Sequence, residues 1–116
     1  IMIRKPKRIK LPKTLASYTV CNSNGEHCAV GYLLHKAGVS NETLLNMCMD
    51  TPVLYNGIEY WSYKELFRDI YEYRFVNEII SKNDNSKTTV EKLDHLKKLL
   101  NDLGIKYYGD KDAKET

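Results

Sequence analysis

The most apolar helical segment of this sequence reads Glu26-His27-Cys28-Ala29-Val30-Gly31-Tyr32-Leu33-Leu34-His35-Lys36-Ala37-Gly38. The polar residues 22–25 precede it, and Gly38 stands where a helix would end. Small residues alternate in it with larger apolar ones, so another element can approach the helix backbone closely. We therefore expect residues 26–37 to form the central, most buried helix, with a glutamate in its first turn and a lysine in its last turn.

Size and composition limit the class of protein. The chain has 116 residues, of which 42% are hydrophobic, and this fits one domain with a core adequate for independent folding. No apolar run reaches the roughly 18 residues of a membrane span, and the first residues lack the apolar core of a secretory signal. Three cysteines without a C-x-x-C pair argue against a disulfide framework and a standard zinc site. We expect a cytoplasmic protein with no cofactor, no metal and no membrane partner.

Three local signals precede the middle of the chain. Residues 15–21 are rich in β-branched and aromatic residues, which predicts a short strand or an extended segment leading to a turn. Ser40 is a good N-cap for a second helix over residues 41–49. Asn56-Gly57 separates two short apolar runs, and both residues tolerate positive φ, so we expect a β-hairpin with a type I′ turn.

Two capping boxes mark the remaining helices. Ser62 with Glu65 opens a helix over residues 63–81, in which the aromatic cluster at 71–75 leaves room for a break into two. A second box at Thr88-Thr89-Val90-Glu91 opens the last helix, which Gly104 closes. We expect Asn83 and Asp84, just before this helix, to form a turn and satisfy its free N–H groups.

These elements predict a mainly α fold with a minor β component (α+β): a compact single domain of about four helices with one small β-hairpin. Residues 14–109 would form the globular domain. Residues 110–116 are charged, contain no large apolar residue and are expected to be loose.

The N-terminal residues 1–13 form a basic arm. They contain no acidic residue, whereas the whole chain carries a net charge of +3, so the remainder is negative; the cations are Arg4, Lys5, Lys7, Arg8, Lys10 and Lys13. Two prolines in the arm block a helix and favour extended backbone. The arm is either a surface for phosphate groups or acidic partners, or a solvated terminus.

A family resemblance follows from two of these motifs. Cys28-Ala29-Val30-Gly31-x-Leu33, followed by Asn83-Asp84 and the Thr-capped helix, resembles a domain-of-unknown-function family found in bacteria and their phages. Members of that family pair a C-A-x-G-x-L helix with a downstream N-D turn that opens the last helix. The resemblance implies a protein of a phage or mobile element, without an assigned reaction.

Cys28 is the candidate nucleophile. A position in the first turn of a helix would lower the pKa of its thiol. His27 and His35 cannot pair with it along one helix, so His95 would have to act as the base, with Asp84 or Asn83 orienting it. The simpler interpretation is that Cys28 is a small packing residue in close contact with the last helix. The set Cys21, His27, Cys28 and Cys48 does not predict a metal site, because adjacent residues on a helix do not converge on one ion.

Aromatic residues crowd into positions 55–73: Tyr55, Tyr60, Trp61, Tyr63, Tyr71 and Tyr73. Aromatic rings with a polar tip are enriched in protein interfaces and also stack on single-stranded nucleic acid. The alternative is an aromatic core between the hairpin and the long helix. The cations lie elsewhere, in the arm, and this separation favours a protein partner over a nucleic-acid groove.

The sequence thus predicts a non-enzymatic interaction protein of the kind by which phages bind and modulate a host or defence protein. Its predicted contact residues are Tyr55, Tyr60, Trp61 and Tyr63, a surface that would also serve self-association as a homo-oligomer. The alternative is a nucleic-acid-binding accessory protein that uses Arg4, Lys5, Lys7, Arg8 and Lys10. A third hypothesis is a cysteine-dependent hydrolase built on Cys28, His95 and Asp84.

Overall fold

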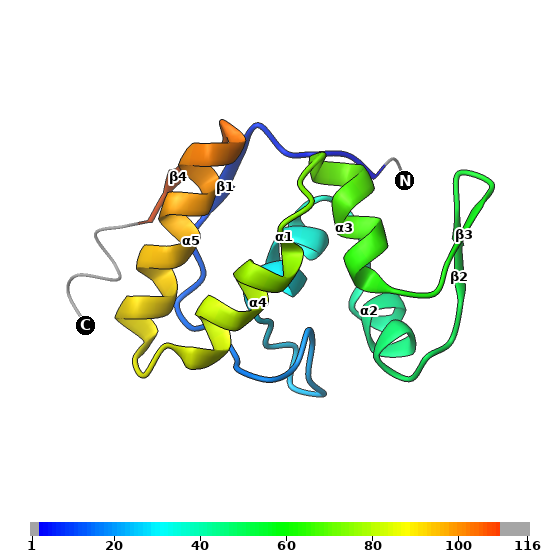
Figure 1. Ribbon diagram of the computed structural model, residues 1–116, viewed down its shortest axis with the longest axis horizontal. Helices are drawn as coiled ribbons and strands as arrows, with labels where there is room; N and C mark the ends of the chain where they lie inside the picture. Colours follow the sequence, from blue (N-terminus) through cyan, green and yellow to red (C-terminus); the bar gives the residue numbers. More distant parts are fainter. Residues whose placement is uncertain (1–2, 110–116) are drawn as a thin grey trace.

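A computed structural model describes residues 3–109, so the predicted tail at 110–116 lies outside the described residues. Helices dominate the architecture, as predicted, with short strands at both ends of the molecule (Figure 1). The elements, in chain order, are β1 (Arg8–Lys10), α1 (Ala29–Lys36), α2 (Asn41–Cys48), β2 (Val53–Tyr55), β3 (Ile58–Tyr60), α3 (Tyr63–Tyr71), α4 (Val76–Asn85), α5 (Thr89–Leu103) and β4 (Lys106–Tyr108).

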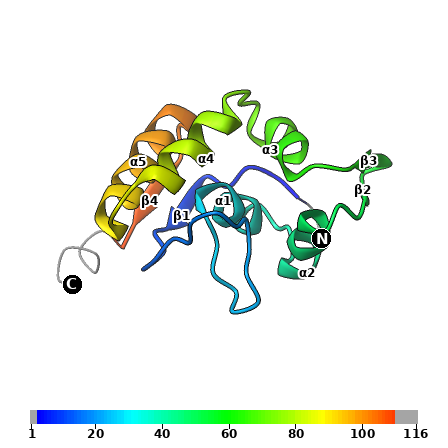
Figure 2. The same cartoon turned by 60° about the horizontal axis from the view of Figure 1, so that its bottom comes forward.

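Helix α1 is the centre of the fold. Figures 1 and 2 show it in the middle of the molecule, with α4 and α5 on one side and α2 and α3 on the other. Val30, Leu33 and Leu34 are completely buried in it, which agrees with the predicted central helix. The helix begins later than predicted, because Cys28 is its N-cap, and so Glu26 lies before the helix and not in its first turn.

The segment before α1 lies against this helix. A single β-bridge joins Cys21 and His27, so residues 15–21 form the extended segment leading to a turn and not the short strand. Asn22 organises the turn, since its Oδ1 accepts hydrogen bonds from the N–H groups of Asn24 and Glu26. Close approach occurs at Gly31, where a Cβ would lie 1.8 Å from the carbonyl oxygen of Val20. The sequence suggested that the last helix makes this close approach. The element that does so is instead the segment before α1.

The predicted α2 and hairpin are both present. Ser40 caps α2, with its Oγ accepting from the N–H of Thr43 at 3.2 Å. Strands β2 and β3 pair antiparallel, with Tyr55 opposite Ile58. The turn between them places Asn56 at φ 53° and Gly57 at φ 77°. Positive φ at both central residues is what a type I′ turn requires.

The long helical stretch breaks in two, so the described residues contain five helices and not four. Glu72 ends α3 in the left-handed conformation, at φ 52°, and α4 starts at Val76. Tyr71 and Val76 on the two sides of the break are both buried, and the hydroxyl of Tyr71 donates to the carbonyl of Leu33 in α1. The break lets α4 pack against α1, while α3 reaches α1 through Tyr71 at its end.

The last helix matches its prediction. Thr88 caps α5, accepting from the N–H of Glu91 at 3.1 Å, and Gly104 ends it at φ 71°. Its buried face consists of Leu93, Leu96, Leu99, Leu100 and Leu103.

Strand β4 follows α5 and was not predicted. It pairs in parallel with β1, which brings the N-terminal arm into the fold. The arm is extended, but Ile9 and Leu11 are buried in the core. No helix within residues 3–109 has the length and apolar character needed to cross a membrane.

Candidate functional site

The side chain of Cys28 is buried at the start of α1. Its Sγ accepts a hydrogen bond from the N–H of Gly31 at 3.5 Å, as an N-cap does. Burial nevertheless raises the pKa of Cys28 to about 11, because desolvation outweighs the stabilising backbone hydrogen bonds. The N–H groups of Val30 and Gly31 at the helix terminus do lower this pKa, as expected, but burial has the larger effect, and a raised pKa disfavours the nucleophilic thiolate.

Cys28 lies beside a cavity that we call the thiol cavity. It has a volume of about 470 Å³ and is lined by Tyr18, Thr19, Val20, Cys28, Met47, Cys48, Asp50, Tyr63, Ile80 and Asp84. Four residues singled out from the sequence thus meet there: Cys28, Cys48, Tyr63 and Asp84. None of the described lining residues is a histidine or a lysine, and the titratable groups beside the thiol are the carboxylates of Asp50 and Asp84, the Tyr18 and Tyr63 hydroxyls and the Cys48 thiol.

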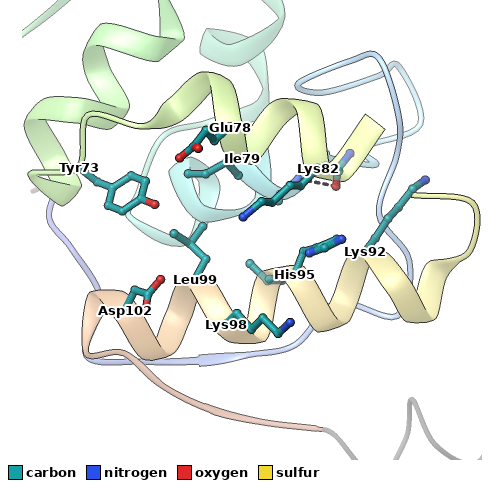
Figure 3. Close-up of a pocket in the computed structure, with 12 residues that line it drawn as sticks. Tyr73, Glu78, Ile79, Lys82, Lys92, His95, Lys98, Leu99 and Asp102 are labelled. Carbon is teal, nitrogen blue, oxygen red and sulfur yellow. Dashed lines mark hydrogen bonds between the residues drawn. The ribbon is translucent and has the colours of Figure 1, made fainter. Parts of the chain in front are cut away.

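His95 lines a different cavity, the groove between α4 and α5 (Figure 3). Lys82 and Lys98 lie near His95, whereas Tyr73, Glu78 and Asp102 gather toward the other end. The groove is narrow, with a cavity volume of about 60 Å³. Since Cys28 and His95 line separate cavities, the geometry does not bring the proposed nucleophile and base together.

Asn83 and Asp84 act differently from the prediction. Both lie in the last turn of α4, and Thr88 caps α5, so the assignment of Asn83-Asp84 to a turn that caps the last helix was wrong. Asn83 Oδ1 accepts from the N–H of Ala29 at 3.3 Å, and its Nδ2 donates to the carbonyl of Ala16 at 2.8 Å. Asp84 Oδ1 accepts from the N–H of Tyr18 at 2.8 Å. The pair therefore fastens the segment before α1, and the start of α1 itself, to α4.

The predicted tyrosines of the hairpin are largely structural. Tyr60 is 6% exposed, and its hydroxyl donates to Asp69 Oδ2 at 2.7 Å. Tyr55 and Tyr63 are half-buried against the core. Trp61 is the exposed member of the predicted set, at 58%.

Two apolar side chains of the hairpin that were not in the predicted set are also exposed. Leu54 is 71% exposed and Ile58 is 52% exposed. Ile58 shares the face of the strands that carries Tyr60, whereas Leu54 lies on the other face. We call Leu54 and Trp61 the hairpin surface. Figures 1 and 2 show that β2 and β3 project beyond α2 and α3 at one end of the molecule. The alternation of a strand could have identified Leu54, because it points away from the face that carries the buried Tyr60.

The cations of the arm lie on the surface. Arg4, Lys5, Lys7, Arg8 and Lys10 are all exposed. Their backbone is fixed nonetheless: Arg4 N–H donates to the carbonyl of Ala37 at 3.0 Å, and Lys106 N–H donates to the carbonyl of Lys7 at 3.1 Å. The arm thus presents its charges from a defined position.

Within residues 3–109 no group of three or more His, Cys, Asp and Glu side chains is arranged to hold a metal ion. Comparisons with protein-family models, with curated proteins and with solved structures find no match to this chain.

The three cysteines give a direct test of the thiol. Iodoacetamide at pH 7.5 should modify the exposed Cys48 quickly, and Cys21 and Cys28 only after denaturant is added, because both are buried. Cys28→Ala should cost about 1 kcal/mol of unfolding free energy, since one sulfur is removed from a packed site. Mass spectrometry of the labelled peptides and chemical denaturation provide the readouts. Rapid modification of Cys28 in the folded protein would contradict the structural role and revive the hydrolase hypothesis.

Proposed function

We propose that this chain is a non-enzymatic protein-interaction module whose contact surface is the hairpin surface. The observation that carries the proposal is that Leu54 and Trp61 are exposed large apolar side chains on one projecting hairpin, at 71% and 58%. Large apolar side chains that gather on the surface mark interaction sites. Tryptophan is also the residue type most enriched at the energetic centre of interfaces.

The hairpin is suited to this role because its base is anchored. Tyr60 and Val53 are paired across the strands, and Tyr60 is held by Asp69 of α3. The hydroxyl of Tyr55 donates to Thr43 Oγ1 of α2 at 3.4 Å. A surface held in place in this way loses little conformational entropy on binding.

The enzymatic alternative has less support. A cysteine hydrolase needs a thiolate and a base within hydrogen-bond reach. Cys28 is a buried thiol with a raised pKa, and His95 lines another cavity. The resemblance of the Cys28 and Asn83-Asp84 motifs to a bacterial and phage family leads us to propose a host or defence protein as the partner.

The test compares variants that remove apolar contacts without entering the core. Trp61→Ser and Leu54→Ser should abolish retention of the partner by the immobilised chain, while the melting temperature changes by only a few degrees. Val90→Ser is the matched control, because Val90 is also an exposed apolar residue (61%) but lies on α5. Native chain and Val90→Ser should retain the same partner, and sedimentation would detect self-association through the same surface.

Equal retention by all variants, or equal loss with Val90→Ser, would contradict the proposal. Tyr60→Ala is not a suitable variant for testing association. Tyr60, a predicted contact residue, is buried, so its truncation is expected to destabilise the domain.

A further inference from the structure

The small sheet of β1 and β4 presents a basic face. The strands pair Arg8 with Lys106, Ile9 with Tyr107, and Lys10 with Tyr108. Side chains alternate between the two faces of a sheet, so Arg8, Lys10, Lys106 and Tyr108 share one face. Exposure agrees with this alternation, because these residues are exposed, whereas Ile9 is buried and Tyr107 half-buried.

The charges on this face are unbalanced. Arg8 and Lys106 are directly paired across the strands, and like charges in that position destabilise a sheet. Residues 1–13 and 103–109 contain no acidic residue. Within residues 3–109, none of the three cations of this face forms an ion pair. An anionic ligand bound to this face would relieve the repulsion between its cations. The face is therefore suited to such a ligand.

Aromatic rings lie among these cations. The guanidinium carbon of Arg8 is 4.4 Å from the ring centroid of Tyr108, which is 45% exposed. At the Lys10 end, the hydroxyl of Tyr32 donates to the carbonyl of Lys10 at 2.5 Å, and Lys36 Nζ lies 5.3 Å from the Tyr32 ring centroid. Aromatic and basic residues, separate in the sequence, therefore interleave here in space.

We propose that this basic face binds single-stranded nucleic acid. Arg8, Lys10 and Lys106 would contact phosphates, and Tyr108 with its Arg8 partner would offer a surface on which an unpaired base stacks. Stacking distinguishes this ligand from an acidic protein, which would use the cations alone. It also favours a single strand over a duplex, whose bases are already stacked. The face lies beside α5, at the opposite end of the molecule from the hairpin surface, so this inference is independent of the proposed function (Figure 1).

The experiment measures fluorescence anisotropy of a labelled oligo-dT strand with the full chain over a range of salt concentrations. Three phosphate contacts predict a slope of log K against log salt of about −2, from about −0.7 per contact on single strands. Arg8→Glu should reduce this slope and the affinity. The melting temperature of this variant should not fall. The substitution replaces the like-charge pair of Arg8 and Lys106 with a pair of opposite charges.

Two further variants make the assignment specific. Arg68→Glu makes the same charge change at an exposed site on α3, away from the face, and should leave binding nearly unchanged. Tyr108→Ala should weaken binding by about 5-fold or more without altering the salt slope, because it removes a stacking surface and no charge.

Two outcomes would overturn the proposal. The first is equal loss of binding in Arg8→Glu and Arg68→Glu, which would indicate a general charge effect. The second is equal binding of poly-glutamate and oligo-dT of the same charge, with no effect of Tyr108→Ala, which would assign the face to acidic proteins instead.

Discussion

Gly31→Ala is expected to destabilise the domain by about 3 kcal/mol or more, at the upper end of the cost of overpacking a core. The added Cβ would lie 1.8 Å from the carbonyl oxygen and 2.8 Å from the carbonyl carbon of Val20. These are backbone atoms, so no side-chain rotation relieves the clash. The segment before α1 would have to move away from the helix, which would expose the buried Val20 and Cys21.

The direction of the stability change distinguishes a clash with Val20 from the ordinary effect of alanine in a helix. In the interior of a helix, alanine is normally more stable than glycine by about 1 kcal/mol. A stabilised or unchanged Gly31→Ala variant would therefore show that Val20 does not lie against the helix. Thermal denaturation provides the readout, with an expected fall in Tm of more than about 10 °C.

Gly57→Ala is the matched control for this variant. Nothing lies within 4 Å of a Cβ at Gly57, but the residue has a φ of +77°. Alanine should cost only about 1 to 2 kcal/mol there, the price of a left-handed backbone for a residue with a side chain. A loss at Gly57 as large as that at Gly31 would contradict the assigned cause.

Local chemistry in the sequence was enough to predict several elements. Ser40, Thr88 and Gly104 each occupy the helix end that their residue type favours. Asn56-Gly57 forms the expected turn, because both residues accept positive φ at little cost. Signals of this kind depend on neighbours in the chain, so a single sequence contains them.

The sequence alone does not show which distant segments pair with each other. The β1–β4 pairing joins short strands from opposite ends of the described chain, and neither strand has a periodicity long enough to predict it. Trp61 was predicted, but the exposed Leu54 and Ile58 were missed for a related reason. Residue type alone favoured Tyr60 as a contact, whereas its burial depends on Asp69 and on packing against the core.

The candidate catalytic residues Cys28, His95 and Asp84 also depend on contacts between distant segments. Cys28 and Asp84 do line one cavity, although they are far apart in sequence. The pKa of Cys28 depends on how completely the surrounding segments bury it, and the position of a helix terminus says nothing of that burial.

Asn83 is the residue whose role differs most from its prediction, and its replacement has the second large expected effect. Its side chain is 2% exposed and joins α4 to two other segments, through the N–H of Ala29 and the carbonyl of Ala16. Asn83→Leu keeps a similar volume but leaves both backbone groups without this partner. Each unpaired buried group costs about 1 to 3 kcal/mol, so we expect a loss of about 2 to 5 kcal/mol in chemical denaturation.

Asn85→Leu is the matched control for the Asn83 variant. Asn85 lies in the same turn of α4, but it is exposed and its amide bonds only to Ser81 Oγ at 3.1 Å. Its replacement should change stability by no more than about 0.5 kcal/mol. Equal effects of the two leucine variants would contradict the role assigned to Asn83.

Asn83→Asp separates the two hydrogen bonds. The new carboxylate can still accept from the N–H of Ala29 at the start of α1, but when ionised it cannot donate to the carbonyl of Ala16, and it lies beside Asp84. Both effects favour the protonated form, so the folded-state pKa of the introduced carboxyl is raised above the unfolded value of about 3.9. Such a group stabilises the fold at low pH and loses that contribution as pH rises. The stability deficit relative to the native chain should therefore be largest near pH 7 and shrink as the pH falls toward about 4. A deficit that does not change with pH would mean that the donated hydrogen bond to Ala16 contributes nothing.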